Sequence, residues 1–210
     1  MFEDLYTYEI VLLTAGFLLF LALLALVIIQ TTKEKPVRPL LYFFIPTIIM
    51  MGYPGIQSFS ISKDKLELTK IQEQLMEEPT DEKTKEQLAE LTKKVELRAK
   101  TDRDYLQLSK SYLLLNENEK ALLASEKAVE LNPSNARAKQ IMIVAQAKVT
   151  LDHSEELSNV ERRSAIDKLK NSTWLNAHQV FKKVTLETYK PLVLDYYPIL
   201  FDTIDNPTHP

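Results

Sequence analysis

The chain has 210 residues, of which 45% are apolar and 26% are charged, and its formal net charge is -3. Without a basic excess it lacks the composition of a nucleic-acid-binding protein, and without cysteine it cannot be a disulfide scaffold. All three glycines precede residue 63, so the rest of the chain carries no glycine-rich phosphate loop.

The first strongly apolar segment runs from Ile10 to Ile29 and contains no charged residue. Twenty residues of α-helix span about 30 Å, which matches the hydrocarbon core of a bilayer. A cleaved signal peptide is the alternative, but no basic residue precedes the segment and no small-residue cleavage site follows it. We therefore expect a retained transmembrane helix over residues 10–30, after an N-terminal flank of residues 1–9.

A second charge-free segment extends from Pro39 to Ser62. Pro46 removes one helical hydrogen bond, and the Gly-Tyr-Pro-Gly stretch at 52–55 can end a helix. Residues 40–62 are nevertheless long enough to cross a membrane, where prolines are tolerated. The sequence predicts a second transmembrane helix that is kinked, with a re-entrant or interfacial segment as the alternative.

The connector between these segments, residues 31–39, holds Lys33, Lys35 and Arg38 against the single acid Glu34, whereas the first nine residues hold three acids and no base. The positive-inside rule places the connector in the cytoplasm and the N-terminus outside. If both segments span, everything after residue 62 also lies outside. We therefore expect a bacterial inner-membrane protein with a periplasmic domain.

The chain after residue 62 has the apolar spacing of amphipathic helices. A first stripe runs from Leu66 to Leu75, and a second from Leu88 to Val95, with a break at 79–82 that opens the second helix with acidic residues. Two helices joined by so short a turn predict an antiparallel hairpin. A coiled coil is the second choice, because too few heptads are present.

The next hairpin has a more specific pattern. Thr101 and Asp104 have capping-box spacing, and 116–119 forms a turn between two helices that Pro133 finally ends. The positions that define the two helices are Tyr105, Leu108, Ser109, Tyr112, Ala121, Ser125 and Ala128. The first helix therefore presents aromatic and small side chains on one face, and the second presents small ones that allow close packing.

On these positions, residues 102–135 resemble a tetratricopeptide repeat of 34 residues, with Pro133 at the terminal proline. Ser125 departs from the usual large apolar residue, and Ser109 replaces the usual glycine. The resemblance covers about one sixth of the chain, and the flanking hairpins are degenerate. It implies that residues 63–170 form a solenoid of helical hairpins with a right-handed twist and a concave face built from the first helix of each pair.

Three basic residues mark a candidate binding surface on that concave face. Arg103 and Lys110 lie seven residues apart on one helix, and Arg137 follows Arg103 by one repeat length. The resemblance implies that such residues hold acidic peptides or a terminal carboxylate through charge-assisted hydrogen bonds. A chance alignment among many basic residues is the alternative.

The C-terminal segment, residues 171–210, is rich in aromatic residues and is either a cap on the last hairpin or a docking segment for another subunit. The candidates for docking are Trp174, Phe181, Tyr196, Tyr197 and Phe201.

We expect no catalytic, cofactor or metal site and therefore no enzyme. His153 stands near Glu155 and Glu156 in a turn typical of solvated side chains, and neither His178 nor His209 has ligand-spaced partners. The expected partners are other proteins and the lipid bilayer, without nucleic acid or a small-molecule substrate. The sequence thus favours a membrane-anchored tetratricopeptide-like scaffold or adaptor. The alternative is an accessory structural subunit of a large transporter, motor, secretion or respiratory complex, held mainly by its transmembrane helices.

Overall fold

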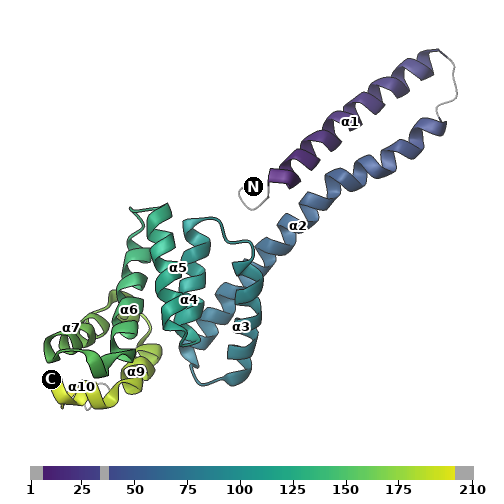
Figure 1. Cartoon of the computed structure of the whole chain (residues 1–210). Coiled ribbons are helices and arrows are strands. Elements are labelled where there is room, and N and C mark those ends of the chain that lie inside the picture. Colours follow the sequence, from purple (N-terminus) through teal and green to yellow (C-terminus); the bar gives the residue numbers. More distant parts are fainter. Residues whose placement is uncertain (1–6, 34–37, 202–210) are drawn as a thin grey trace. The chain divides into compact units, whose positions relative to one another are not determined.

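The computed structural model describes residues 7–33 and 38–201, and these residues form helices and connections without a strand (Figure 1). The chain divides into an N-terminal unit that ends at Lys65 and a C-terminal unit that begins at Leu66. The predicted all-α class is therefore confirmed for the described residues.

The N-terminal unit pairs α1 (Thr7–Thr32) with the first part of α2 (Arg38–Glu77). Gly16 permits a close approach, since a Cβ atom there would lie 2.9 Å from Met51 Cγ. Further along, the rings of Phe20 and Phe44 meet edge to face at 5.6 Å. Because contacts later in α1 fall earlier in α2, the two segments run antiparallel, and a small residue at the crossing lets the backbones approach closely.

Among the described residues, α1 is the one helix long and apolar enough to cross a membrane. The second predicted span needs correction, because the strongly apolar part of α2 covers only Leu41–Tyr53. That length gives about 20 Å of helix, less than the hydrocarbon core of about 30 Å. The helix continues through the Gly-Tyr-Pro-Gly stretch at 52–55 and beyond the predicted end at residue 62, to Glu77. An isolated proline costs a helix one hydrogen bond, which a long continuous helix tolerates.

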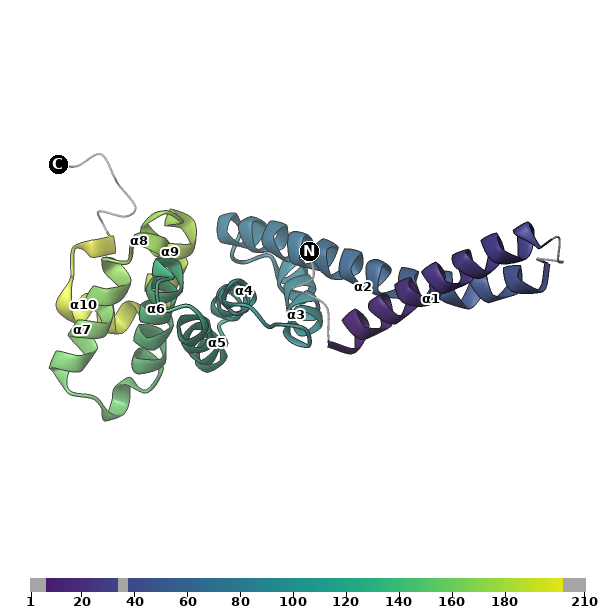
Figure 2. The ribbon, with the colours of Figure 1, turned by 90° about the horizontal axis from the view of Figure 1, so that it is seen from above.

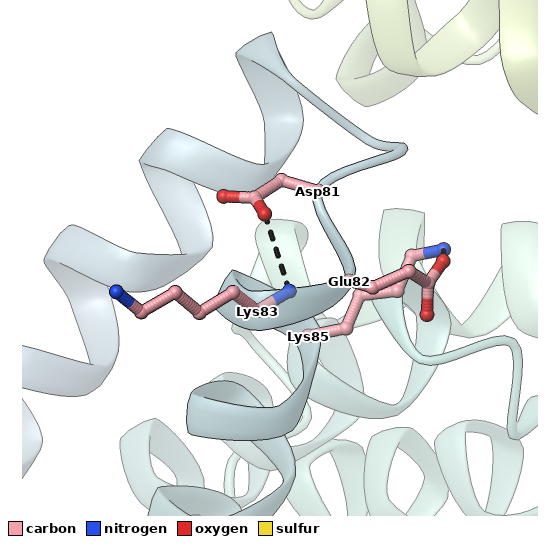
Figure 3. Close-up of polar contacts among 4 residues, drawn as sticks. All are labelled: Asp81, Glu82, Lys83 and Lys85. Carbon is pink, nitrogen blue, oxygen red and sulfur yellow. Dashed lines mark hydrogen bonds and ion pairs between the residues drawn. The ribbon is translucent and has the colours of Figure 1, made fainter.

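The C-terminal unit begins with the last part of α2 and with α3 (Glu82–Glu96), which form the predicted hairpin. Asp81 caps α3 by accepting a hydrogen bond from the backbone N–H of Lys83 at 3.2 Å (Figure 3). The Thr84 hydroxyl also donates to this carboxylate and is the main cause that lowers the pKa of Asp81. The apolar stripes of both helices enter one core, through Leu68, Ile71, Leu75, Leu88, Leu91 and Val95.

The next helices follow one another across the unit: α4 (Asp102–Leu114), α5 (Asn118–Leu131), α6 (Ala136–Asp152) and α7 (Asn159–Lys170), with the short 3-10 turn η1 (Ser154–Glu156) before α7 (Figure 2). The predicted capping box of α4 is present, because Thr101 N–H donates to Asp104 Oδ2 at 3.1 Å and Asp104 N–H donates back to Thr101 Oγ1 at 3.2 Å. Asn116, with a positive φ of 61°, makes the turn into α5. Asparagine tolerates this left-handed conformation better than most side chains.

The tight contact between α4 and α5 comes from the small residues noted in the sequence. Ala121 and Ala128 are completely buried, and the buried Ser109 hydroxyl donates to the Ala121 carbonyl oxygen at 2.7 Å. Leu108 and Tyr112 are buried as well, whereas Tyr105 is half-buried and Pro133 is exposed in the connection to α6. These placements form one helical hairpin, with α6 packed against both of its helices.

The aromatic segment folds as α8 (Thr173–Asn176), α9 (Gln179–Thr188) and α10 (Lys190–Tyr196). Three of the five docking candidates, Trp174, Phe181 and Phe201, are buried among the core residues, which favours the alternative of a cap on the last hairpin. Trp174 and Phe181 meet edge to face at 5.8 Å. Only Tyr196 and Tyr197 of the five remain half-buried at the surface.

Candidate functional site

The C-terminal unit contains a groove of about 510 Å³ that crosses successive helices. Its lining residues come from α2 (Thr69, Gln72, Glu73, Met76), α4 (Gln107, Lys110), α6 (Arg137, Gln140) and the α8 region (Thr173, Trp174, Ala177, His178). The lining thus comes from α2, α4, α6 and α8, which are every second α-helix along the chain. The groove therefore crosses several hairpins and does not follow a single one.

A buried amide fixes the floor of the groove where α2 meets α4. Gln72, which is 2% exposed, donates through Nε2 to the Gln107 carbonyl oxygen at 2.8 Å and to Ser111 Oγ at 2.7 Å. Gln107 in turn donates to Thr69 Oγ1 at 3.4 Å. Because a buried amide is costly unless it is hydrogen-bonded, this arrangement holds the two helices in one register.

Two of the three basic residues predicted for the concave face meet in this groove. Lys110 on α4 is half-buried and Arg137 on α6 is exposed, and both side chains line the same cavity. Within the described residues, neither has a salt-bridge or hydrogen-bond partner for its charged group. Burial and the nearby Arg137 lower the pKa of Lys110, and Glu73 partly opposes them. Two cations are thus held close together without a counter-ion in contact.

Arg103, the third predicted residue, does not line the groove. It is exposed in the first turn of α4, and seven residues of helix separate it from Lys110 by about 10 Å along the axis. Sequence spacing correctly placed the two side chains on similar faces of one helix. It could not show that the groove occupies only the second half of that face.

Two further titratable groups and an aromatic ring line the groove. Glu73 lies on α2, and His178 directly precedes α9, with its ring 5.8 Å from that of Trp174. Burial, together with Lys110, lowers the pKa of His178, so its imidazole is neutral near pH 7. The sequence singled out Trp174 only as a docking aromatic and gave Glu73 no role, because neither position carries a motif.

Elsewhere in the unit, a buried lysine and a nearby aspartate belong to a hydrogen-bonded group. Lys148 on α6 is 3% exposed and donates to Asn116 Oδ1 at 3.0 Å. One turn on, Asp152 accepts from the Tyr189 hydroxyl at 2.7 Å and from Asn118 Nδ2 at 2.6 Å. We call these five residues the Lys148 cluster. Its hydrogen bonds tie α9 to the hairpin of α5 and α6, as expected of a structural polar network.

A second hollow, of about 680 Å³, follows α7 and Tyr196. Its charged residues, Arg163, Asp167 and Lys168, include both signs, and the Tyr197 hydroxyl donates to Asp167. Its lining comes from α7, Asn171 and Tyr196, whereas the groove brings together side chains from α2, α4, α6 and the α8 region, so the groove is the better candidate for a binding site.

Metal-ligating side chains do not gather in threes anywhere in the described ranges. His153 is exposed at the end of α6, where its Nδ1 lies 3.0 Å from the Val149 carbonyl oxygen. That hydrogen bond is the main cause that raises the pKa of His153. His209 lies outside the described residues.

Comparison of the chain with family models, curated proteins and solved structures finds no match. The tetratricopeptide likeness therefore rests on the residues of 102–135 and on the hairpin that they form. The function has to be argued from the groove.

Proposed function

We propose that this protein is a membrane-anchored, tetratricopeptide-like adaptor that binds acidic segments of other proteins in the groove of its C-terminal unit. The observation that carries the proposal is the pair Lys110 and Arg137, which line one groove without a counter-ion in contact among the described residues. Charges that leave bulk water are normally paired. A carboxylate from a ligand supplies that pairing, and a guanidinium beside an ammonium suits it well.

The binding test uses the full chain in a mild detergent. Trp174 is the single tryptophan of the sequence and lines the groove, so its fluorescence reports occupancy. An acidic peptide is titrated into the natural protein and into the double variant Lys110→Ala with Arg137→Ala. We expect the double variant to bind about tenfold or more weakly, because each charged hydrogen bond contributes roughly 1.5–3 kcal/mol before screening.

The matched control removes two cations that already have partners. Lys120 and Lys127 lie on α5 and form salt bridges with Glu117 and Glu130, at 2.7 and 2.8 Å. The double variant Lys120→Ala with Lys127→Ala loses the same net charge but should retain the affinity within about twofold, since exposed pairs contribute little. Equal losses in both double variants, or no binding by the natural protein, would refute the proposal.

We further propose that α1 spans a bacterial inner membrane. The charge-free segment from Pro39 to Ser62 is longer than the strongly apolar Leu41–Tyr53 part of α2, and we propose that this whole segment crosses back and puts the C-terminal unit in the periplasm. The antiparallel contact of Gly16 with Met51 supports this arrangement. The chain has no cysteine, so single cysteines can be introduced at Lys33 and at the exposed Ser134. A membrane-impermeant maleimide should label position 134 and not 33 in intact spheroplasts. The opposite result would place the unit in the cytoplasm.

The alternative function, an accessory subunit held by its membrane helices, is distinguished by exchange of the anchor. Residues 1–62 are replaced by an unrelated transmembrane hairpin, and the proteins that copurify in mild detergent are identified. An adaptor that works through its groove retains its partners after the exchange, whereas an integral subunit loses its complex.

A further inference from the structure

The helices α7 and α10 lie together at the end of the C-terminal unit that is opposite α3 (Figure 2). Two hollows meet on this end. The first, of about 680 Å³, is lined by α7, Asn171 and Tyr196, and the second, of about 310 Å³, is lined by residues 196–200. Tyr196 belongs to both linings, so the hollows adjoin, and we call them together the end face.

Large apolar side chains are exposed on the end face. Val160, in the first turn of α7, is 78% exposed and lines the first hollow. Ile199, which follows α10, is 66% exposed and lines the second hollow. The outer face of a terminal helical repeat is usually polar, because no further repeat covers it. Apolar side chains that gather beside hollows are typical of a surface that binds another molecule.

Two tyrosines attach the end of α10 to α7. The Tyr196 hydroxyl donates to Asn159 Oδ1 at 3.2 Å, and the Tyr197 hydroxyl donates to Asp167. Lys170 Nζ also lies 3.8 Å from the centre of the Tyr197 ring, in a cation–π contact. These contacts form the hollows before any partner arrives, and a preformed surface loses less conformational freedom on binding.

The charged groups that remain available on the end face are cations. Arg163 and Lys168 line the first hollow, are exposed, and make no hydrogen bond or salt bridge to another residue that the structure describes. Both acidic residues of α7 already accept hydrogen bonds. Glu161 accepts two that cap the start of the helix, and Asp167 accepts the bond from a tyrosine hydroxyl. Acidic side chains on a partner therefore complement the end face.

We propose that the end face binds an amphipathic segment of another protein, whose apolar side chains enter the two hollows and whose acidic side chains pair with Arg163 and Lys168. A lipid surface matches the end face less well, because membrane-binding faces project their apolar side chains, whereas these border hollows. A second copy of the chain would place the same cations opposite one another across a two-fold contact.

The end face is separate from the groove, since the two linings share no residue. An adaptor with both surfaces can hold two partners at once. The proposal for the end face therefore stands or falls independently of acidic binding in the groove.

The test uses the full chain in nanodiscs of phosphatidylcholine, with empty nanodiscs as the blank. Three capped, helix-forming peptides are titrated by calorimetry. The acidic amphipathic peptide has a stripe of leucines bordered by glutamates, the basic one has lysines in place of the glutamates, and the polar one has serines in place of the leucines. We expect the acidic amphipathic peptide to bind about tenfold more tightly than the basic one, because attractive pairs replace repulsive ones. The polar peptide should not bind measurably, since it offers the hollows no apolar side chain.

Paired variants assign the binding to the end face. Val160→Ser with Ile199→Ser should weaken the acidic amphipathic peptide about tenfold or more, because two apolar contacts are lost. The control, Leu123→Ser with Leu131→Ser, removes two leucines of α5 that are 66% and 45% exposed, and should leave the affinity within about twofold.

A second pair of variants tests the charges. Arg163→Ala with Lys168→Ala should weaken the acidic amphipathic peptide about fivefold and reduce its advantage over the basic one. Lys120→Ala with Lys127→Ala, on α5, loses the same net charge and should leave both affinities unchanged.

Several results would overturn the proposal and name another occupant or none. Equal affinity of the acidic and basic peptides, or equal losses in the two serine double variants, would show that the end face does not select this partner. Peptide binding that appears only after residues 202–210 are removed would identify that segment, which contains Asp202 and Asp205, as the occupant. Binding to phosphatidylglycerol vesicles in place of the peptide, or a dimer that Val160→Ser with Ile199→Ser abolishes, would assign the end face to lipid or to a second copy.

Discussion

Two lysines of the same unit leave bulk water in different ways. Lys148 is 3% exposed, donates to Asn116 at 3.0 Å and lies one turn before Asp152 in a hydrogen-bonded cluster. Lys110 is half-buried, lines a groove and has no contacting partner within the described residues. Burial lowers the pKa of both ammonium groups. The two lysines differ in their hydrogen-bond partners. A buried charged group that has partners helps to hold helices together, whereas a charged group without partners at the edge of a groove is available to a ligand.

The largest effect expected from this comparison is on stability, through Tyr189. Its side chain is 6% exposed, and its hydroxyl donates to Asp152 at 2.7 Å. Tyr189→Ala should lower the free energy of unfolding by about 4 kcal/mol, because a buried aromatic ring is removed. Tyr189→Phe should lower it by about 2 kcal/mol, since it keeps the ring and removes the hydroxyl, whose shortest hydrogen bond is to the charged Asp152.

Urea unfolding of the full chain in detergent, followed by Trp174 fluorescence, measures these changes. Lys110→Ala is the matched variant in the groove and should change the free energy of unfolding by less than about 0.5 kcal/mol, because its ammonium group has no hydrogen bond or salt bridge to another described residue. The comparison fails if Lys110→Ala lowers the free energy of unfolding as much as Tyr189→Phe does. In that case the groove lysine is itself structural.

The second prediction concerns pH and the Lys148 cluster. Burial lowers the pKa of Lys148 to about 8 from its usual value of 10.5. Between these pH values the unfolded chain binds more protons than the folded chain, so stability rises with pH. From pH 7 to pH 10 the gain should be about 2 kcal/mol. Above pH 10 the trend reverses, because burial and the hydrogen bond to Asp152 raise the pKa of Tyr189 above its usual value of 10.

Lys148→Met keeps the volume of the side chain but cannot titrate, so it isolates this contribution. The variant should lose the rise between pH 7 and 10 and keep the decline above pH 10. Urea unfolding at each pH measures both. An equal rise in the natural protein and the variant would assign the effect to other groups.

The sequence predicts those parts of the structure that depend on residues close together in the chain, and it predicts less well the parts that depend on contacts between distant residues. The hairpin of α4 and α5 was predictable because its determinants are local: the Thr101 capping box, the small residues at Ala121 and Ala128, and the proline after α5. The extent of α2 was less predictable: Pro46 and the stretch at 52–55 can each end a helix, yet α2 continues through both to Glu77. Local composition is a weak guide where tertiary contacts decide.

The groove was only partly predictable, for the same reason. Periodicity brought Lys110 and Arg137 to similar faces of two helices, and the structure places both in one cavity. Glu73, Trp174 and His178 come from helices before and after the recognisable repeat. Their convergence depends on how successive hairpins pack, which no spacing within one helix encodes. Likewise, aromatic content alone could not distinguish the buried Phe181 and Phe201 from a docking surface.

The smallest expected effect is the pH dependence of binding through His178. Lys110, Arg137 and Glu73 line the groove with its ring, and burial together with Lys110 lowers the pKa of the free imidazole. A bound carboxylate offsets that repulsion and raises the pKa, so binding takes up a proton. Affinity for an acidic peptide should then rise about threefold from pH 7.5 to 5.5, a range that lies above the usual titration of carboxylates.

His178→Gln keeps a hydrogen-bonding side chain without a titrating group and should bind with an affinity that is constant over this range. Calorimetry in two buffers of different ionisation enthalpy counts the protons directly. If His178→Gln takes up as many protons as the natural protein, the imidazole does not sense the ligand, and the unpaired cations alone determine binding in the groove.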